Sequence, residues 1–269
     1  MTFFRAGPIL SLFGALVSVF LMLPLVSVIP ISFTPKRFVS MPKGDWSLRH
    51  YEALFSDPVW GASVLMSLKV GLVAAGLATL LALLFALGIW MMRPRFSGAM
   101  IGTALLPMMA PPVVSALTLY FFLKDLSDIN SIVGYDTWLG VAVAHTVMVA
   151  PYAVVILFVS LSQFDRKVDM AARSMGASVW TRITQVIIPN IKFGIAGAFL
   201  MSFVLSWDEI GVTLFVTSVN AITLPRRMWM GLRDNVDPAV AALSVLIIVL
   251  VSVVIILRAL HTHFGSRTK

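Results

Sequence analysis

Long apolar stretches alternate with short polar segments along this chain. Six of them are long enough to cross the roughly 30 Å hydrocarbon core of a bilayer as helices that rise about 1.5 Å per residue. They cover residues 9–31, 68–92, 100–123, 138–161, 193–217 and 239–260. We therefore expect an all-α polytopic membrane protein with six transmembrane helices. A single transmembrane domain should account for residues 1–269.

The composition supports the membrane class. Hydrophobic residues make up 59% of the chain, charged residues 12%, and the mean hydropathy is +0.96. The 269 residues leave little room for a soluble domain. In a soluble protein the net charge of +8 would suggest nucleic acid as a partner, but here its distribution along the chain matters more. We expect contact with membrane lipid and none with nucleic acid.

Prolines interrupt the third predicted span. Pro107, Pro111 and Pro112 each lack a backbone N–H, so carbonyl groups one turn earlier lose their partners. Freed carbonyls at membrane depth must meet neighbouring helices or a cavity. We expect this span to be kinked and packed inside the bundle.

Charge sets the expected orientation. If the N-terminus lies inside the cell, the inner segments carry eleven Lys and Arg residues against only Asp165 and Asp169, while the outer segments carry eight basic and eight acidic residues. The positive-inside rule counts basic residues, so it favours this orientation modestly. Both termini, and the polar loop at residues 163–192, are then expected in the cytoplasm.

The loop at residues 163–192 has the pattern helix, glycine turn, helix. Ala171 and Ala172 favour a first helix, and Gly176 can end it in a left-handed conformation. Ser178 offers an N-cap for a second, amphipathic helix that Pro189 bounds. Such a pair suits docking of a short helix into a groove on a soluble partner. An ordinary cytoplasmic helix-turn-helix loop is the alternative.

The same loop resembles a known motif. The residues Asp169-Met170-Ala171-Ala172, then Gly176, then Val186-Ile187-Ile188-Pro189 are similar to the EAA loop of binding-protein-dependent ABC importer permeases. That pattern is Glu-Ala-Ala, three residues, Gly, nine residues, Ile-x-Leu-Pro. Met170 stands where the family has glutamate, with Asp169 as the nearest acid. Val186 and Ile188 replace the usual Ile and Leu.

We find no catalytic apparatus in the sequence. There is no Gly-x4-Gly-Lys-Ser/Thr phosphate loop, no His-Glu-x-x-His motif and no cysteine. The four histidines, His50, His145, His261 and His263, are scattered, so we expect no metal site. His145, in the fourth span, is expected to hydrogen-bond another helix or a carbonyl freed by Pro151.

Two adjacent acids in the fifth predicted span are the candidate solute contacts. Asp208 and Glu209 fall beyond its midpoint, where a charge is costly and marks function or a buried ion pair. Because neighbours on a helix point about 100° apart, only one is expected to face a pathway, and we favour Asp208. Trp207 and Tyr120 are candidates for cation–π contact with an organic cation, although membrane aromatics more often serve packing.

The alternative for this acidic pair is a structural ion pair. Its partners would be Lys69, or Arg226 and Arg227.

The resemblance extends over residues 60–260. The prolines around Pro107, His145 with Pro151-Tyr152, Ser202-Phe203 through Asp208-Glu209, and Thr223-Leu224-Pro225 together look like the spermidine/putrescine-type branch of the permease family. That resemblance implies a type I ABC importer permease of the bacterial inner membrane. The resemblance also implies that this subunit has no enzymatic activity and no cofactor of its own, because ATP and Mg bind the partner ATPase.

The implied partners are two cytoplasmic ATPase subunits, which receive Asp169 to Gly176, a second permease subunit, identical or homologous, and a periplasmic binding protein. The implied solute is a polyamine-like organic cation. Related permeases carry iron, thiamine, phosphonates or amino-acid derivatives. A stand-alone ion-coupled carrier is the alternative in another class, but such carriers often show inverted repeats, and none is evident. A membrane enzyme would need a polar catalytic cluster.

Overall fold

A computed structural model describes residues 7–234 and 237–265 of the chain, and these residues form helices and connecting segments. The backbone contacts divide the chain into two compact units. One combines Met1–Gly61 with Met228–Lys269, and the other is Ala62–Arg227. Each is described by itself, and the single domain expected over residues 1–269 stays a prediction.

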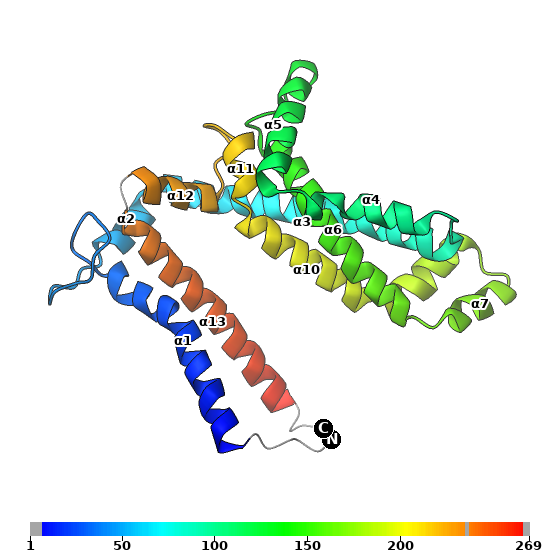
Figure 1. Cartoon of the computed structure of the whole chain (residues 1–269), viewed down its shortest axis with the longest axis horizontal. Coiled ribbons are helices and arrows are strands. Elements are labelled where there is room, and N and C mark those ends of the chain that lie inside the picture. The colour runs from blue at the N-terminus through cyan, green and yellow to red at the C-terminus, as the bar shows by residue number, and fades with distance from the viewer. Residues whose placement is uncertain (1–6, 235–236, 266–269) are drawn as a thin grey trace. The chain divides into compact units, whose positions relative to one another are not determined.

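The first unit contains the first two helices of the chain and its last helix. It holds α1 (Pro8–Ser32), α2 (Arg49–Ser56) and α13 (Ala239–Gly265). Helix α13 packs against both α1 and α2 (Figure 1). A hydrogen bond of 2.7 Å between Ser32 Oγ and Tyr51 Oη joins the end of α1 to α2. The apolar side chains along α1 are exposed, as expected of a helix that faces lipid.

The second unit contains the remaining helices. Two of them cross between the units, because α3 begins in the first unit and α12 ends there. In chain order they are α3 (Pro58–Met92), α4 (Ser97–Met109), α5 (Pro112–Ile129), α6 (Trp138–Gln163), α7 (Arg166–Ser174), α8 (Val179–Thr181), the π-helix η1 (Arg182–Ile187), α9 (Ile188–Asn190), α10 (Lys192–Asp208), α11 (Gly211–Val216) and α12 (Leu224–Asp234).

Two clusters of buried side chains hold this unit together. The first lies where α3, α6 and α10 pack, and it includes Leu87, Leu157 and Leu161. The second joins α5, α6 and α11, and it includes Leu123 and Val212. Alanine is frequent in both clusters, as expected where helices approach closely without a hydrophobic driving force between them.

The six-span prediction agrees with one way of counting the helices. Among the described residues, four helices are long and apolar enough to cross a membrane: α1, α3, α6 and residues 239–260 of α13. The number rises to six if each of two bent pairs is one span. These pairs are α4 with α5, bent by 98°, and Val179–Asn190 with α10, bent by 72°.

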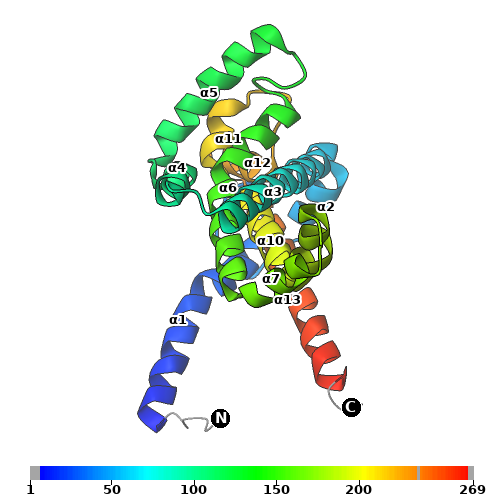
Figure 2. The same ribbon diagram turned by 90° about the vertical axis from the view of Figure 1, so that its right-hand side faces the viewer.

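The helices differ from the predicted spans at three places. Helix α3 begins at Pro58, ten residues before the expected start at residue 68, because a proline is accommodated in the first turn of a helix. The third span is broken in two, as Figure 2 shows for α4 and α5. Ala110 and Pro111 adopt extended backbone (ψ 142° and 133°) because each precedes a proline. The fifth span ends at Asp208, and the short helix α11 follows.

Candidate functional site

Helix α7 is the centre of the candidate site, and its two ends are closed by local hydrogen bonds. Asp165 is the N-cap, and its carboxylate accepts from the backbone N–H of Lys167 at 2.9 Å. At the other end Gly176 has φ +83°. The left-handed turn expected at this glycine is therefore confirmed.

The turn at Gly176 has the hydrogen bonds of a Schellman motif. The N–H of Gly176 donates to the carbonyl of Arg173 at 3.0 Å, and the N–H of Ala177 donates to that of Ala172 at 3.1 Å. A Cβ placed on Gly176 would meet no heavy atom within 4 Å. The requirement for glycine inside this chain is thus conformational, and the space beside it is open.

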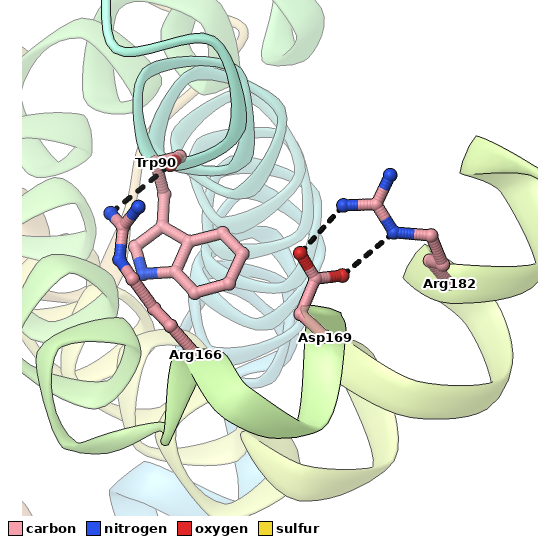
Figure 3. Close-up of polar contacts among 4 residues, drawn as sticks. All are labelled: Trp90, Arg166, Asp169 and Arg182. Carbon is pink, nitrogen blue, oxygen red and sulfur yellow. Dashed lines mark hydrogen bonds and ion pairs between the residues drawn. The ribbon is translucent and has the colours of Figure 1, made fainter. Parts of the chain in front are cut away.

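An ion pair joins α7 to the helix that follows the turn. Arg182 donates from Nε to Asp169 Oδ1 at 2.8 Å and from Nη2 to Oδ2 at 2.5 Å (Figure 3). The side chains of Arg182 and Asp169 are only 12% and 11% exposed. The two parallel bonds fix both distance and orientation. Asp169, which stood out as the acid nearest the motif's missing glutamate, therefore has its carboxylate occupied inside the loop.

A second arginine fixes the start of α7. The guanidinium of Arg166 lies over the ring of Trp90, 4.5 Å from the centroid, and Nη2 donates to the Trp90 carbonyl at 3.2 Å (Figure 3). Trp90 belongs to the buried cluster between α3, α6 and α10. Stacking and hydrogen bonding together tie α7 to the end of α3.

The second half of the loop is rooted in that same buried cluster. The Ser178 hydroxyl accepts from the N–H of Thr181 at 3.2 Å, so the expected N-cap is confirmed. The expected regular helix is replaced by one α-turn, the π-helix η1 and a second short α-turn that contains Pro189. Ile187 is fully buried and Ile191 nearly so. The loop therefore lies partly within the helical core.

Large apolar side chains are exposed on the loop, beside charged ones such as Lys167 and Arg173. Met170 is 57% exposed, Met175 81% and Trp180 73%, whereas Ala172 is buried against the protein. Ala171 is exposed. Large apolar side chains gathered on an otherwise polar and basic loop are typical of a surface that contacts a partner or the membrane.

The two acids of the fifth predicted span lie at a break between helices. Asp208 is the last residue of α10, and its side chain is exposed. Glu209 lies between the helices, and its Oε1 accepts from the N–H of Val212 at 2.9 Å, which caps α11. Among the side chains that the structure describes, the only ion pair joins Arg182 to Asp169. The alternative of a structural ion pair is not seen for either acid there.

The two aromatic candidates have separate neighbours. Trp207 packs against Phe203, with ring centroids 5.9 Å apart. Tyr120, on α5, lies edge-on to Tyr135 at 5.3 Å. The Nζ of Lys124 lies 5.8 Å from the centroid of the Tyr120 ring. The face of Tyr120 is thus already close to a cation from its own helix.

His145 hydrogen-bonds other helices, which is one of the two kinds of contact expected of it. It is fully buried on α6, with Nδ1 2.8 Å from the Ser206 hydroxyl and Nε2 2.8 Å from the Thr213 hydroxyl. Its partners are therefore hydroxyl groups on α10 and α11, so the expected hydrogen bond to another helix is confirmed, and a carbonyl freed near Pro151 is not among these partners. Among the described residues no group of three or more His, Cys, Asp or Glu could hold a metal. The side chains of His261 and His263 lie outside the described residues.

A further anchoring residue, Asp136, carried no distinctive signal in the sequence. It precedes α6 with φ +57°, and its carboxylate accepts the backbone N–H groups of residues 218–221, the shortest being Ser218 at 2.7 Å. Burial raises the pKa of Asp136, but these N–H groups outweigh it and lower the pKa overall. The carboxylate thereby fixes the segment between α11 and α12.

The sequence matches one protein family and several known transport proteins. Residues 78–269 match the model of a family described as binding-protein-dependent transport system inner membrane component. The spermidine/putrescine transport system permease protein PotC of Haemophilus influenzae is 30% identical over 251 residues, which cover 93% of this chain and 95% of that one. The putrescine transport system permease protein PotI of Escherichia coli is 28% identical, over 87% and 84%.

Two further matches define the breadth of the likeness. A probable molybdenum ABC transporter permease protein of Haloferax volcanii is 29% identical, over 83% of this chain and 85% of that one. A crystal structure of a bacterial ABC transporter involved in the import of the acidic polysaccharide alginate has the same fold. It has a TM-score of 0.67, 13% sequence identity, and coverage of 97% and 98%.

Proposed function

The chain belongs to the family of inner membrane components of binding-protein-dependent transport systems, and we propose that it is one permease subunit of an ATP-driven importer of polyamine-like cations. As a member of this family it is a multi-pass membrane transport protein. The observation that carries the proposal is the family match over residues 78–269, which includes the whole loop from α7 to α9.

We propose that the loop docks on an ATPase subunit through α7 and the turn at Gly176. Several contacts would pass a displacement of α7 into the bundle. The ion pair between Asp169 and Arg182 links α7 to η1, and Ile187 and Ile191 anchor η1 and its continuation in the cluster that also holds Ala198 of α10. Closure of the ATPase dimer could thus bias two states of the bundle.

The exposed Met170 bears on the chemistry of that docking. The resemblance puts a glutamate at this position, and Asp169 does not replace it because its carboxylate is bonded to Arg182. We propose that the ATPase cleft presents apolar side chains to Met170 and Met175. Apolar contact with flexible methionines suits a site that must bind, release and rebind.

The solute assignment rests on two supports. Two of the relatives are named for putrescine or for spermidine and putrescine. Asp208 is exposed at the end of α10 and free of any ion pair with the described residues, so it can meet an ammonium group, with Trp207 beside it on the same helix. The molybdenum-named relative makes an oxyanion the competing solute, and a carboxylate in the pathway would repel it.

The complete importer would need further chains. We propose two ATPase subunits that bind ATP and Mg, a second permease subunit, and a binding protein that delivers solute on the outer side. We propose that both termini lie in the cytoplasm, the orientation that the positive-inside rule favours. Arg5, Arg267 and Lys269, which contribute to that count, lie outside the described residues.

The test is uptake by vesicles that carry the whole complex, with ATP inside and the binding protein outside. Radiolabelled putrescine, spermidine and molybdate are offered separately, with and without a proton or sodium gradient. We expect accumulation of a polyamine that requires both ATP and the binding protein. Accumulation of molybdate alone would overturn the cation assignment and leave the importer class intact, whereas uptake driven by an ion gradient without ATP would overturn the importer class.

A further inference from the structure

A basic pocket lies beside the start of α7, outside the docking surface described above. Its volume is about 520 Å³, and it opens where α3 gives way to α4 and where α6 gives way to α7. Figure 1 shows α7 at the same end of this unit as the junction between α3 and α4. The lining residues are Ile89, Trp90, Arg93, Ser97, Phe158, Leu161, Ser162, Phe164 and Arg166.

Positive charge dominates the pocket. Arg93 and Arg166 are its two charged lining residues, and no carboxylate lines it. The nearest acids along the chain are engaged elsewhere, since Asp165 caps α7 and Asp169 binds Arg182. Burial lowers the pKa of Arg166 and repulsion from Arg93 lowers it further, against an opposing effect of Asp169. The two guanidinium groups therefore share a site without a negative partner among the pocket's own residues.

The Arg166 guanidinium is positioned before any ligand arrives. It lies 4.5 Å from the centroid of the Trp90 ring and donates to the Trp90 carbonyl, which uses one of its five N–H donors (Figure 3). Arg93 sits at the end of α3 with φ +48°, and its N–H donates to the Ile89 carbonyl at 3.0 Å. The Arg166 guanidinium, held beside Trp90, and the exposed Arg93 side chain together offer N–H donors suited to the oxygens of a phosphate.

We place the pocket at the depth of phospholipid headgroups, because it lies where two candidate membrane helices end. Helices α3 and α6 are both long and apolar enough to span a bilayer, and the pocket is at the polar end of each. Phe158 and Phe164 form its apolar wall, while Ser97 and Ser162 add hydroxyl groups. A ligand with a phosphate, a polar backbone and apolar chains matches these surroundings better than a free ion does.

We propose that this pocket binds the headgroup phosphate of an anionic phospholipid, with Arg93 and Arg166 on the phosphate oxygens and the acyl chains along the apolar wall. The proposal goes beyond the transport function and depends only on the chain being a membrane protein. Because Arg166 is the first residue of α7, a bound lipid also fixes the beginning of the loop. The lipid composition of the membrane would thereby influence how firmly α7 is positioned.

The test uses the intact importer complex, purified in detergent and examined by native mass spectrometry with added phosphatidylglycerol or phosphatidylcholine. The test variant is Arg93→Gln with Arg166→Gln. The matched control is Arg95→Gln, a nearby exposed arginine that lies over Phe96 and does not line the pocket. We expect the wild type to retain phosphatidylglycerol in preference to phosphatidylcholine, and the double variant to bind it about 30-fold more weakly, since each basic residue near an anionic surface contributes about fivefold. Arg95→Gln should match the wild type.

Several results would overturn the proposal. Equal binding of the two lipids by the wild type, or unchanged phosphatidylglycerol binding in the double variant, would remove the specific site. Release of the bound lipid by millimolar glycerol phosphate would identify a soluble phosphate as the ligand. If the double variant instead sheds the ATPase subunits and keeps its lipid, the pocket belongs to a protein interface. Failure of the transport proposal would leave the lipid measurement unaffected, so the two can be judged separately.

Discussion

Loss of the Arg182 side chain should loosen α7 without unfolding the bundle. The substitution Arg182→Ala leaves the Asp169 carboxylate, which is 11% exposed, without either of its two charge-assisted hydrogen bonds. Removing one partner of a fully buried pair costs about 3–5 kcal/mol. Because water still reaches this pair, we expect about 2–3 kcal/mol here. The cost falls on the contact between α7 and η1, because Trp90 holds α7 independently through Arg166.

Hydrogen exchange measured by mass spectrometry on the detergent-solubilised complex tests this expectation. A loss of 2–3 kcal/mol should speed exchange of the α7 amides by about 30- to 150-fold, with little change in α3 and α6. ATP-driven uptake should fall while the complex remains assembled. Arg173→Ala is the matched control, since it removes an exposed arginine from α7 that makes no ion pair with the described residues.

A double-mutant cycle with Asp169→Ala separates the pair from the individual side chains. We expect a coupling free energy of at least about 1 kcal/mol. A value below about 0.5 kcal/mol would refute the reasoning, because the two side chains would then contribute independently. So would normal uptake in a variant whose α7 exchanges rapidly, since the pair would not be needed to transmit movement.

Three further outcomes are expected. Asp208→Asn should impair polyamine uptake while the complex stays assembled. Glu209→Gln should have the smaller effect, because its amide oxygen can still accept from the N–H of Val212 in α11. Normal uptake in both single variants and in the double variant would leave these acids with a structural role. Gly176→Asn should leave uptake unchanged, because asparagine tolerates a positive φ. Gly176→Asp should leave the fold intact but abolish uptake. Normal transport in the aspartate variant would argue against docking at this turn. Asp136→Asn should lower thermal stability at pH 7. Because the pKa of Asp136 is lower in the folded protein, the stabilisation by its carboxylate is complete above about pH 4 and is lost as the pH falls further. The difference in stability from wild type should therefore shrink at pH 3, and an undiminished difference would contradict the role assigned to Asp136.

The sequence predicted the elements whose signals are local. Apolar length identified the membrane helices, and the alanines, Gly176 and Ser178 identified the ends of the loop helices, because helix caps depend on one or two residues. The prolines at 111 and 112 predicted a disturbance of the third span. They did not reveal that it amounts to a break of 98°, since the angle depends on what the two halves pack against.

The missed features arise from contacts between residues far apart in the sequence. The carboxylate of Asp136 meets backbone N–H groups some 82 to 85 positions later, and an isolated aspartate in a loop gives no sign of this. The break after Asp208 carries no proline. The π-helical turn before Pro189 also has no simple sequence signal. The partner of Asp169 lies 13 residues away on another helix and became evident only from the three-dimensional arrangement.

The buried hydrogen bonds of His145 determine how the junction between α10 and α11 can move. The imidazole holds Ser206 before the junction and Thr213 after it, and the Thr213 hydroxyl also lies 2.8 Å from the carbonyl of Glu209 within the junction itself. Straightening this corner would leave buried polar atoms unsatisfied, at a cost of about 1–3 kcal/mol each. The corner is therefore expected to turn as one rigid piece. A rotation imposed on α10 at the loop would then reappear at α11 with its angle preserved, and the access of solute would change by tilting of the whole corner and not by its flexing.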